Sequence, residues 1–313
     1  MMIRICLVLM LAISVVPSQA AAQAVEASAV EEVVITARRA DAPIWEITVG
    51  DGSLILVGAI SGVPRDLSWR PEALEDATRR SDRILFPQIG RASLADLGRV
   101  IWRSRTITRL PDGTTTADYL PPDVQGRLEV VMEGDNERWR SQSLMMLGLN
   151  LITDKAGHQR GRTRGAVDVI QDAARQADVP VRRVGVLRGD AMIENLVTQP
   201  PETYAACIEA AVSAAEAGPE GAARRVEAWR TRRVPDVLAE PLDEALNLCW
   251  PSGDPDVAPL LRAQWAEAIA AALDEPGVTL AVAQLRLLAE PGGVLDMLEA
   301  RGFDIIGPRW RAE

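Results

Sequence analysis

The sequence predicts an α/β fold in which βαβ-type ends build a short mixed β-sheet around a large helical insertion. Two patterns carry this prediction. Short apolar runs bounded by turn residues lie near both ends of the chain, whereas apolar residues in the middle recur at three- and four-residue spacing. The composition agrees, because 48% hydrophobic residues among 313 can form a sizeable core. We therefore expect a single domain over residues 43–313.

The first strands are predicted by alternation and by a turn. Residues 44–49 alternate between apolar and polar side chains, and Asp51-Gly52 marks a tight turn before the apolar run 54–57. Together these segments predict a β-hairpin. The same criteria predict the middle elements in order: a helix from Pro71, a buried strand over 84–86, mainly helix over 94–152, a helix around Asp168, a strand over 181–187, and amphipathic helices over 204–217 and 258–273.

The C-terminal end predicts a strand–helix–strand unit. Apolar runs at 278–283 and 303–306 flank a helical pattern over 294–301. Gly302 stands at the C′ position of that helix, where a positive φ is common. The sheet would therefore receive strands from both ends of the chain.

Charge and residue types exclude some classes of function. Acidic residues outnumber basic ones by 44 to 34, so a broad positive surface for nucleic acid is not expected. Lysine occurs once, at Lys155, and all other positive side chains are arginines. The single histidine, His158, excludes chemistry that needs two histidines from one chain.

The first 24 residues predict a secretory signal peptide. Arg4 precedes an uncharged apolar run over 5–16, and small residues then allow cleavage after Ala20 or Ala24. The run is short for a membrane span, although a retained apolar anchor is the alternative interpretation. We expect export to the periplasm of a Gram-negative bacterium, with no transmembrane segment after cleavage.

Signal cleavage would leave two cysteines, Cys207 and Cys249. An even pair in an oxidising compartment favours a structural disulfide. Closing the loop between them would stabilise the fold by ~4 kcal/mol on the chain-entropy model. Two separately buried thiols are the alternative.

Residues 25–42 are expected to form a flexible linker, since small and charged residues predominate there and the apolar residues follow no regular spacing. Within them, the segment 31–39 resembles the stretch at the mature N-terminus of many TonB-dependent outer-membrane receptors. That resemblance implies an extended segment that pairs with the sheet edge of a TonB-like partner. The alternative is an exported linker that binds no partner.

Several stretches resemble the TraB/GumN family. They are Trp45 with its hairpin, residues 58–61, residues 77–82 and the terminal stretch 293–303. The resemblance implies that family's fold over about residues 43–308, which it shares with Tiki-type metalloproteases, haem-binding ChaN proteins and erythromycin-esterase-like proteins. The specific matches lie at the two ends, and the middle matches by its helical pattern.

Active members of that family carry G-x-x-H after the second strand, an acid on the next strand and a second G-x-x-H before the terminal helix. Such imidazoles and carboxylates hold a divalent metal that activates water. Here the first motif runs from Gly58 to Ser61, Gln88 follows the next strand, and the second motif falls at Gln284 to Leu287 without glycine or histidine. The resemblance therefore implies a vestigial cleft at Gly58, Ser61, Gln88 and Leu287, with no metal and no cofactor.

The other residues that could take part in catalysis or binding are interpreted as structural or surface residues. His158 lies in a polar, glycine-bearing stretch and is expected to be a surface or loop histidine rather than a ligand or base. Ser61 would need a neighbouring base to act as a nucleophile, and we interpret it as a turn-capping serine. The basic run 155–164 could bind an anion, but a solvated loop is the favoured interpretation.

Two functions from different classes remain. The favoured one is an exported pseudoenzyme, a non-catalytic binding or scaffolding domain derived from a metal-dependent hydrolase, whose protein or small-molecule ligand the sequence does not identify. The other is a periplasmic hydrolase or protease with a non-standard site, such as Ser61 with Asp66 or Glu290. A third interpretation makes the segment 31–39 the functional part, as a partner of the TonB system.

Overall fold

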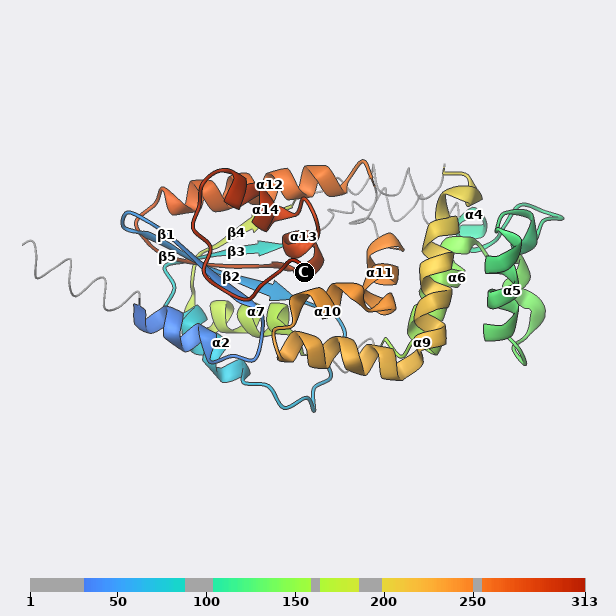
Figure 1. Ribbon diagram of the computed structural model, residues 1–313, viewed down its shortest axis with the longest axis horizontal. Coiled ribbons are helices and arrows are strands. Elements are labelled where there is room, and N and C mark those ends of the chain that lie inside the picture. The colour runs from blue at the N-terminus through green and yellow to red at the C-terminus, as the bar shows by residue number, and fades with distance from the viewer. Residues whose placement is uncertain (1–30, 88–103, 159–163, 186–198, 250–254, 313) are drawn as a thin grey trace, which may run out of the picture.

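A computed structural model describes residues 31–87, 104–158, 164–185, 199–249 and 255–312. The molecule is elongated, with a β-sheet covered by helices towards one end and a helical unit at the other (Figure 1). The predicted α/β class is confirmed, and helices dominate it.

The described residues form a five-stranded mixed sheet. Its strands are β1 (Ile44–Val49), β2 (Gly52–Ala59), β3 (Arg83–Pro87), β4 (Val181–Val184) and β5 (Gly277–Gln284), in the order β1-β2-β5-β3-β4. β1 pairs antiparallel with β2, as the predicted hairpin requires, whereas β2, β5, β3 and β4 run parallel. The central strands β2 and β5 are almost wholly buried because helices cover both faces of the sheet.

Five of the described helices are grouped on the two faces of the sheet. They are α2 (Pro71–Arg79), α7 (Ala166–Ala177), α12 (Ala258–Leu273), α13 (Leu285–Ala289) and α14 (Val294–Ala300). α12, α13 and α14 lie on one face, and α2 and α7 lie on the other (Figure 1). α12 has the predicted bounds, and its buried Leu261, Trp265 and Ile269 form the expected apolar stripe towards the sheet.

The helical insertion has a hydrophobic core of its own. Its short elements are α4 (Ser104–Thr108), α5 (Pro122–Val131), α6 (Leu144–Asn150), the π-helical turn η3 (Leu151–Lys155) and the 3₁₀ turns η1 (Thr116–Asp118), η2 (Glu137–Ser141) and η4 (Pro201–Tyr204). Three further helices connect it to the sheet: α9 (Ala205–Arg230), α10 (Val234–Ala239) and α11 (Pro241–Leu248).

The long helix α9 belongs to both cores. Its first half contributes Cys207 and Ile208 to the core of the insertion, and its second half contributes Val226 and Trp229 to the core around the sheet. Between them Gly218 adopts φ +60° with Pro219 after it, so the α-helical hydrogen bonding is interrupted and the helix bends (Figure 1).

The N-terminal segment differs from the predicted flexible linker. Residues 31–38 form a helix, and Val33, Val34 and Ala37 are buried in the core around the sheet. These three positions share one helical face, so their burial outweighs the strand propensity of the valines. The linker prediction is therefore corrected for residues 31–42, and the segment 31–39 is not extended.

The C-terminal strand prediction is also wrong. Residues 303–306 form no regular strand, and Ile306 makes only an isolated antiparallel bridge with Glu46 of β1. The C-terminal end therefore adds one strand to the sheet, β5, followed by two short helices rather than a complete βαβ unit.

Some predictions fall outside the described residues. They concern the signal peptide over 1–24, Gln88, and residues 159–163 of the basic run. Within the described ranges, no helix combines the length and the apolar composition that crossing a bilayer requires.

Candidate functional site

The first and second family motifs meet at one edge of the sheet. Because β2, β3 and β5 are parallel, their carboxyl ends lie together, and Ala59 at the end of β2 pairs with Gln284 at the end of β5. Ser61 follows β2, and Arg286 follows β5. In open α/β sheets, ligands bind at this edge. Gln88, which comes directly after β3, lies outside the described residues.

A cavity of about 50 Å³ lies at this edge. That volume has room for a few water molecules. Its lining includes Ser61 but neither Gly58 nor Leu287, and it combines both motifs with helices α9 and α11. The polar residues that line it are Ser61, Arg225, Asp243, Asn247, Gln284 and Arg286.

Asp243, in the first turn of α11, accepts hydrogen bonds from two arginines. Arg225 donates from Nε to Oδ1 at 2.7 Å, and Arg286 donates from Nε to Oδ2 at 2.8 Å. The side chains of Arg225 and Asp243 are each only 5% exposed. Buried charges need such pairing, and here both carboxylate oxygens are occupied. We call these three residues the arginine–aspartate network.

The same two arginines connect the network to the backbone around it. Arg225 donates from Nη1 to the carbonyl oxygen of Ser61 at 2.9 Å, and Arg286 donates from Nη2 to the carbonyl oxygen of Leu238 at 2.6 Å. Arg286 also pairs with Glu244 at 2.8 Å. The network thus joins the loop after β2 to α9, α10, α11 and α13.

This donor set does not fit a divalent metal. Ser61 and Leu287 stand where the family resemblance implies imidazoles, and the groups that line the cavity beside Ser61 include two guanidiniums, which have no lone pair to offer a metal. Two guanidinium groups would also repel a cation. Among the described residues, no group of three or more His, Cys, Asp or Glu is placed to hold a metal ion.

Gly58 and Leu287 serve packing at this edge. A Cβ on Gly58 would lie 2.5 Å from Cδ1 of Leu285, so glycine permits the close approach of α13 to β2. The carbonyl oxygen of Gly58 accepts a hydrogen bond from Nε1 of Trp229 at 2.8 Å. Leu287 is 8% exposed and belongs to the core around the sheet. Neither residue presents a polar side chain to the cavity.

His158 lies in a loop, as predicted, but it is buried, at 8% exposed, so the prediction that it is at the surface is wrong. Its ring packs against Gly62, where φ is +79° and a Cβ would lie 2.7 Å from Nδ1. The only imidazole of the chain therefore adjoins the residue after Ser61. The surrounding sequence gave no signal of this contact, because it contains glycine and charged residues that are typical of exposed loops.

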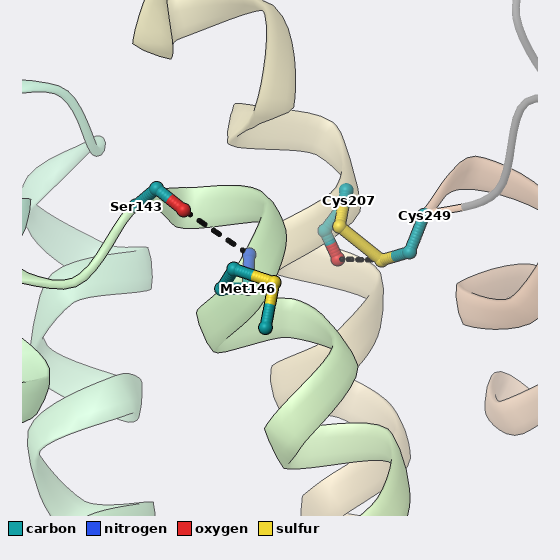
Figure 2. The surroundings of a disulfide bond; sticks show 4 residues. All are labelled: Ser143, Met146, Cys207 and Cys249. Carbon is teal, nitrogen blue, oxygen red and sulfur yellow. Dashed lines mark hydrogen bonds between the residues drawn. A yellow bond between two sulfur atoms is a disulfide. The ribbon is translucent and has the colours of Figure 1, made fainter. Parts of the chain in front are cut away.

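Figure 2 shows the predicted disulfide. The Cα atoms of Cys207 in α9 and Cys249 after α11 are 4.7 Å apart, and their sulfur atoms lie at bonding distance. Helix α6 passes close by, since a Cβ on Gly148 would lie 2.6 Å from Sγ of Cys207. Ser143 caps that helix by accepting a hydrogen bond from the N–H of Met146 at 3.4 Å (Figure 2).

A model of one protein family matches most of the chain. The model of the TraB/PrgY/gumN family matches residues 43–306, a range that holds the sheet, the insertion and the arginine–aspartate network. No curated protein and no solved structure matches the chain.

Proposed function

Since the chain belongs to the TraB/PrgY/gumN family, we propose that it is an exported, non-catalytic binding or scaffolding protein of that family. The observation that carries the proposal is the arginine–aspartate network at the carboxyl ends of the strands. Active relatives are expected to bind a metal there, whereas this chain places two guanidinium groups around one carboxylate.

The network supports a structural role for this edge of the sheet. Through Arg225 and Arg286 it connects the loop after β2 to the helix after β5, the two places where the family motifs stand. A metal held by those motifs would connect the same two segments. Hydrogen bonds of the network therefore connect the loop after β2 to the helix after β5 in place of a metal. They provide no open coordination position at which a water could be activated.

Calorimetric titration of the mature protein with zinc, manganese and cobalt tests this proposal. We expect no stoichiometric site of micromolar or tighter affinity. A site of that affinity that disappears in Ser61→Ala or Asp243→Asn, but persists in Asp172→Asn, would overturn the proposal. Asp172 is a suitable control because it forms a surface pair with Arg175 on α7, away from the cleft.

Export is tested separately by intact-mass measurement on a periplasmic extract. The expected chain begins at Ala21 or Val25, as the two cleavage positions require. Full-length protein confined to the cytoplasm would contradict export. The TonB-partner interpretation is not carried further, because residues 31–38 are helical and Val33 and Val34 are buried.

The position of His158 favours a second candidate, a serine hydrolase. The imidazole adjoins Gly62, and Ser61 is exposed. Neither Asp66 nor Glu290 lines the cavity, and Glu290 is paired with Arg262 at 2.6 Å.

A fluorophosphonate probe discriminates the two functions, because an activated serine oxygen displaces fluoride and forms a covalent bond to phosphorus. Labelling that is lost in both Ser61→Ala and His158→Gln would establish the hydrolase. An unlabelled wild-type protein supports the non-catalytic proposal.

A further inference from the structure

A much larger cavity, of about 730 Å³, lies away from the cleft and shares no lining residue with the 50 Å³ cavity. The N-terminal helical segment, the turn between α9 and α10, and the C-terminal tail form its walls. We call it the arginine pocket, because its charged lining residues are Arg38, Arg232, Arg233, Arg309, Arg311 and a single acid, Asp236.

The charge of this lining is opposite to that of the chain. Acidic residues exceed basic ones by 44 to 34 over the whole sequence, which gives a net charge of −10. In the arginine pocket, five arginines face one aspartate. Three segments that are distant in sequence supply these arginines, so the fold and not a local basic run brings them together.

Arg232 lines the pocket at a conformational cost. Its φ is +60°, in the left-handed region that favours glycine, where it ends α9 in a Schellman motif. Its Nη2 donates to the carbonyl oxygens of Arg38 and Ala40 at 2.8 and 2.9 Å. The carboxylate of Asp41 lies 4.0 Å away, so neutral groups make the shorter contacts to this guanidinium.

Other arginines of the pocket are oriented by carboxylates. Glu46 accepts from Nη2 of Arg38 at 2.8 Å, whereas Arg311 pairs with two acids, Asp296 at 2.6 Å and Glu299, and none of these three acids lines the pocket. Asp236, which does line it, pairs with Arg233. A guanidinium has five N–H donors, so the single carboxylate that pairs with Arg38 or with Arg233 leaves either side chain able to bind a second acceptor.

These pairs determine what kind of ligand the pocket suits. A single exposed ion pair contributes little, and the carboxylates offset part of the positive charge. Useful affinity therefore requires a ligand with several anionic groups that contact several arginines at once. Phosphate groups suit the guanidinium fork and carry more charge than carboxylates at neutral pH. A volume of about 730 Å³ suits an organic molecule rather than a lone ion.

We propose that the arginine pocket binds a small organic polyanion that carries several phosphate groups. The inference goes beyond the proposed function and does not depend on it, because the arginine pocket and the 50 Å³ cavity share no lining residue. The metal titration tests the proposed function and the anion titration tests the arginine pocket, so the result of one does not determine the result of the other.

The test is calorimetric titration of the mature protein with inositol hexakisphosphate, with citrate as the polycarboxylate comparison. Ionic strength is set to about 0.15 M, where charges beyond about 8 Å are screened. We expect saturable binding of one inositol hexakisphosphate per chain and weaker binding of citrate. The double variant Arg38→Gln/Arg233→Gln should bind at least about tenfold more weakly, because two charged hydrogen-bond donors are removed.

Two further variants distinguish specific binding in the arginine pocket from an effect of the net charge of the protein and from a loss of folding. Arg175→Gln is the matched control, since Arg175 and Asp172 form an exposed pair three residues apart, as Arg233 and Asp236 do. It should bind like the wild type. Arg233→Lys keeps the positive charge but loses the paired N–H donors of the guanidinium, so it should bind inositol hexakisphosphate with intermediate affinity. The proposal is overturned by absent saturable binding, by tighter binding of citrate, or by an equal loss in Arg175→Gln.

Discussion

Replacing Asp243 with alanine tests how strongly the arginine–aspartate network supports the fold. The change would leave Arg225, which is 5% exposed, facing the guanidinium of Arg286, which is 15% exposed. Removing one partner of a buried ion pair costs about 3–5 kcal/mol. Arg225 keeps the carbonyl of Ser61, and Arg286 keeps Glu244, so we expect the lower end, about 3 kcal/mol.

The assay is urea unfolding followed by tryptophan fluorescence, because the buried Trp229 lies on α9 one turn from Arg225. Asp172→Ala removes an exposed acid from a surface pair and should cost less than about 0.5 kcal/mol. Arg225→Met/Asp243→Leu should recover most of the loss, since apolar side chains can replace a buried pair without a penalty. If Asp243→Ala costs no more than Asp172→Ala, the network is not a structural support and the reasoning fails.

Three further predictions concern other parts of the chain. Replacing Cys207 and Cys249 with alanine should lower the free energy of unfolding by about 4 kcal/mol, given their separation of 42 residues. Burial raises the pKa of the Asp296 carboxyl, but hydrogen bonds from Trp310, Gly292 and Arg311 outweigh it and lower the pKa below 3.8. The C-terminal tail should therefore stay docked above that value and detach as pH falls through the lower folded-state pKa, which tryptophan fluorescence would detect. Arg232→Gly should be more stable than Arg232→Ala by about 1 kcal/mol in urea unfolding, because only glycine relieves the positive φ.

Each of these predictions has an outcome that contradicts it. Two free thiols in protein purified without reductant would refute the disulfide. The same acid transition in wild type and in Asp296→Asn would show that another group controls the tail. Equal stability of the two Arg232 variants would show that this backbone conformation carries no strain.

The elements that were predicted correctly are specified by nearby residues. The hairpin of β1 and β2 follows from alternation and the Asp51-Gly52 turn, and α12 follows from a three- and four-residue period that ends where predicted. The family resemblance was recognised at the two ends of the chain, and the family match over 43–306 confirms it.

The features that were missed depend on contacts between distant residues. Arg225 and Asp243 are 18 residues apart, and Asp243 and Arg286 are 43 apart, so no local period marks them as one network. The burial of His158 depends on its contact with Gly62. The helix over 31–38 forms where β-branched residues favour a strand, because its apolar face finds a core to cover.

Helices α9 and α11 are fastened to each other at both ends. Cys207 meets Cys249 at one end, and Arg225 meets Asp243 at the other. A bridge needs Cα atoms within about 7 Å, and sliding one helix by a single turn moves them by about 5.4 Å. The disulfide and the Arg225–Asp243 pair therefore fix the position of α11 against α9 on either side of the bend at Gly218. Loss of the disulfide would therefore leave the Arg225–Asp243 pair to hold α11 against the second half of α9, with no covalent bond to its first half.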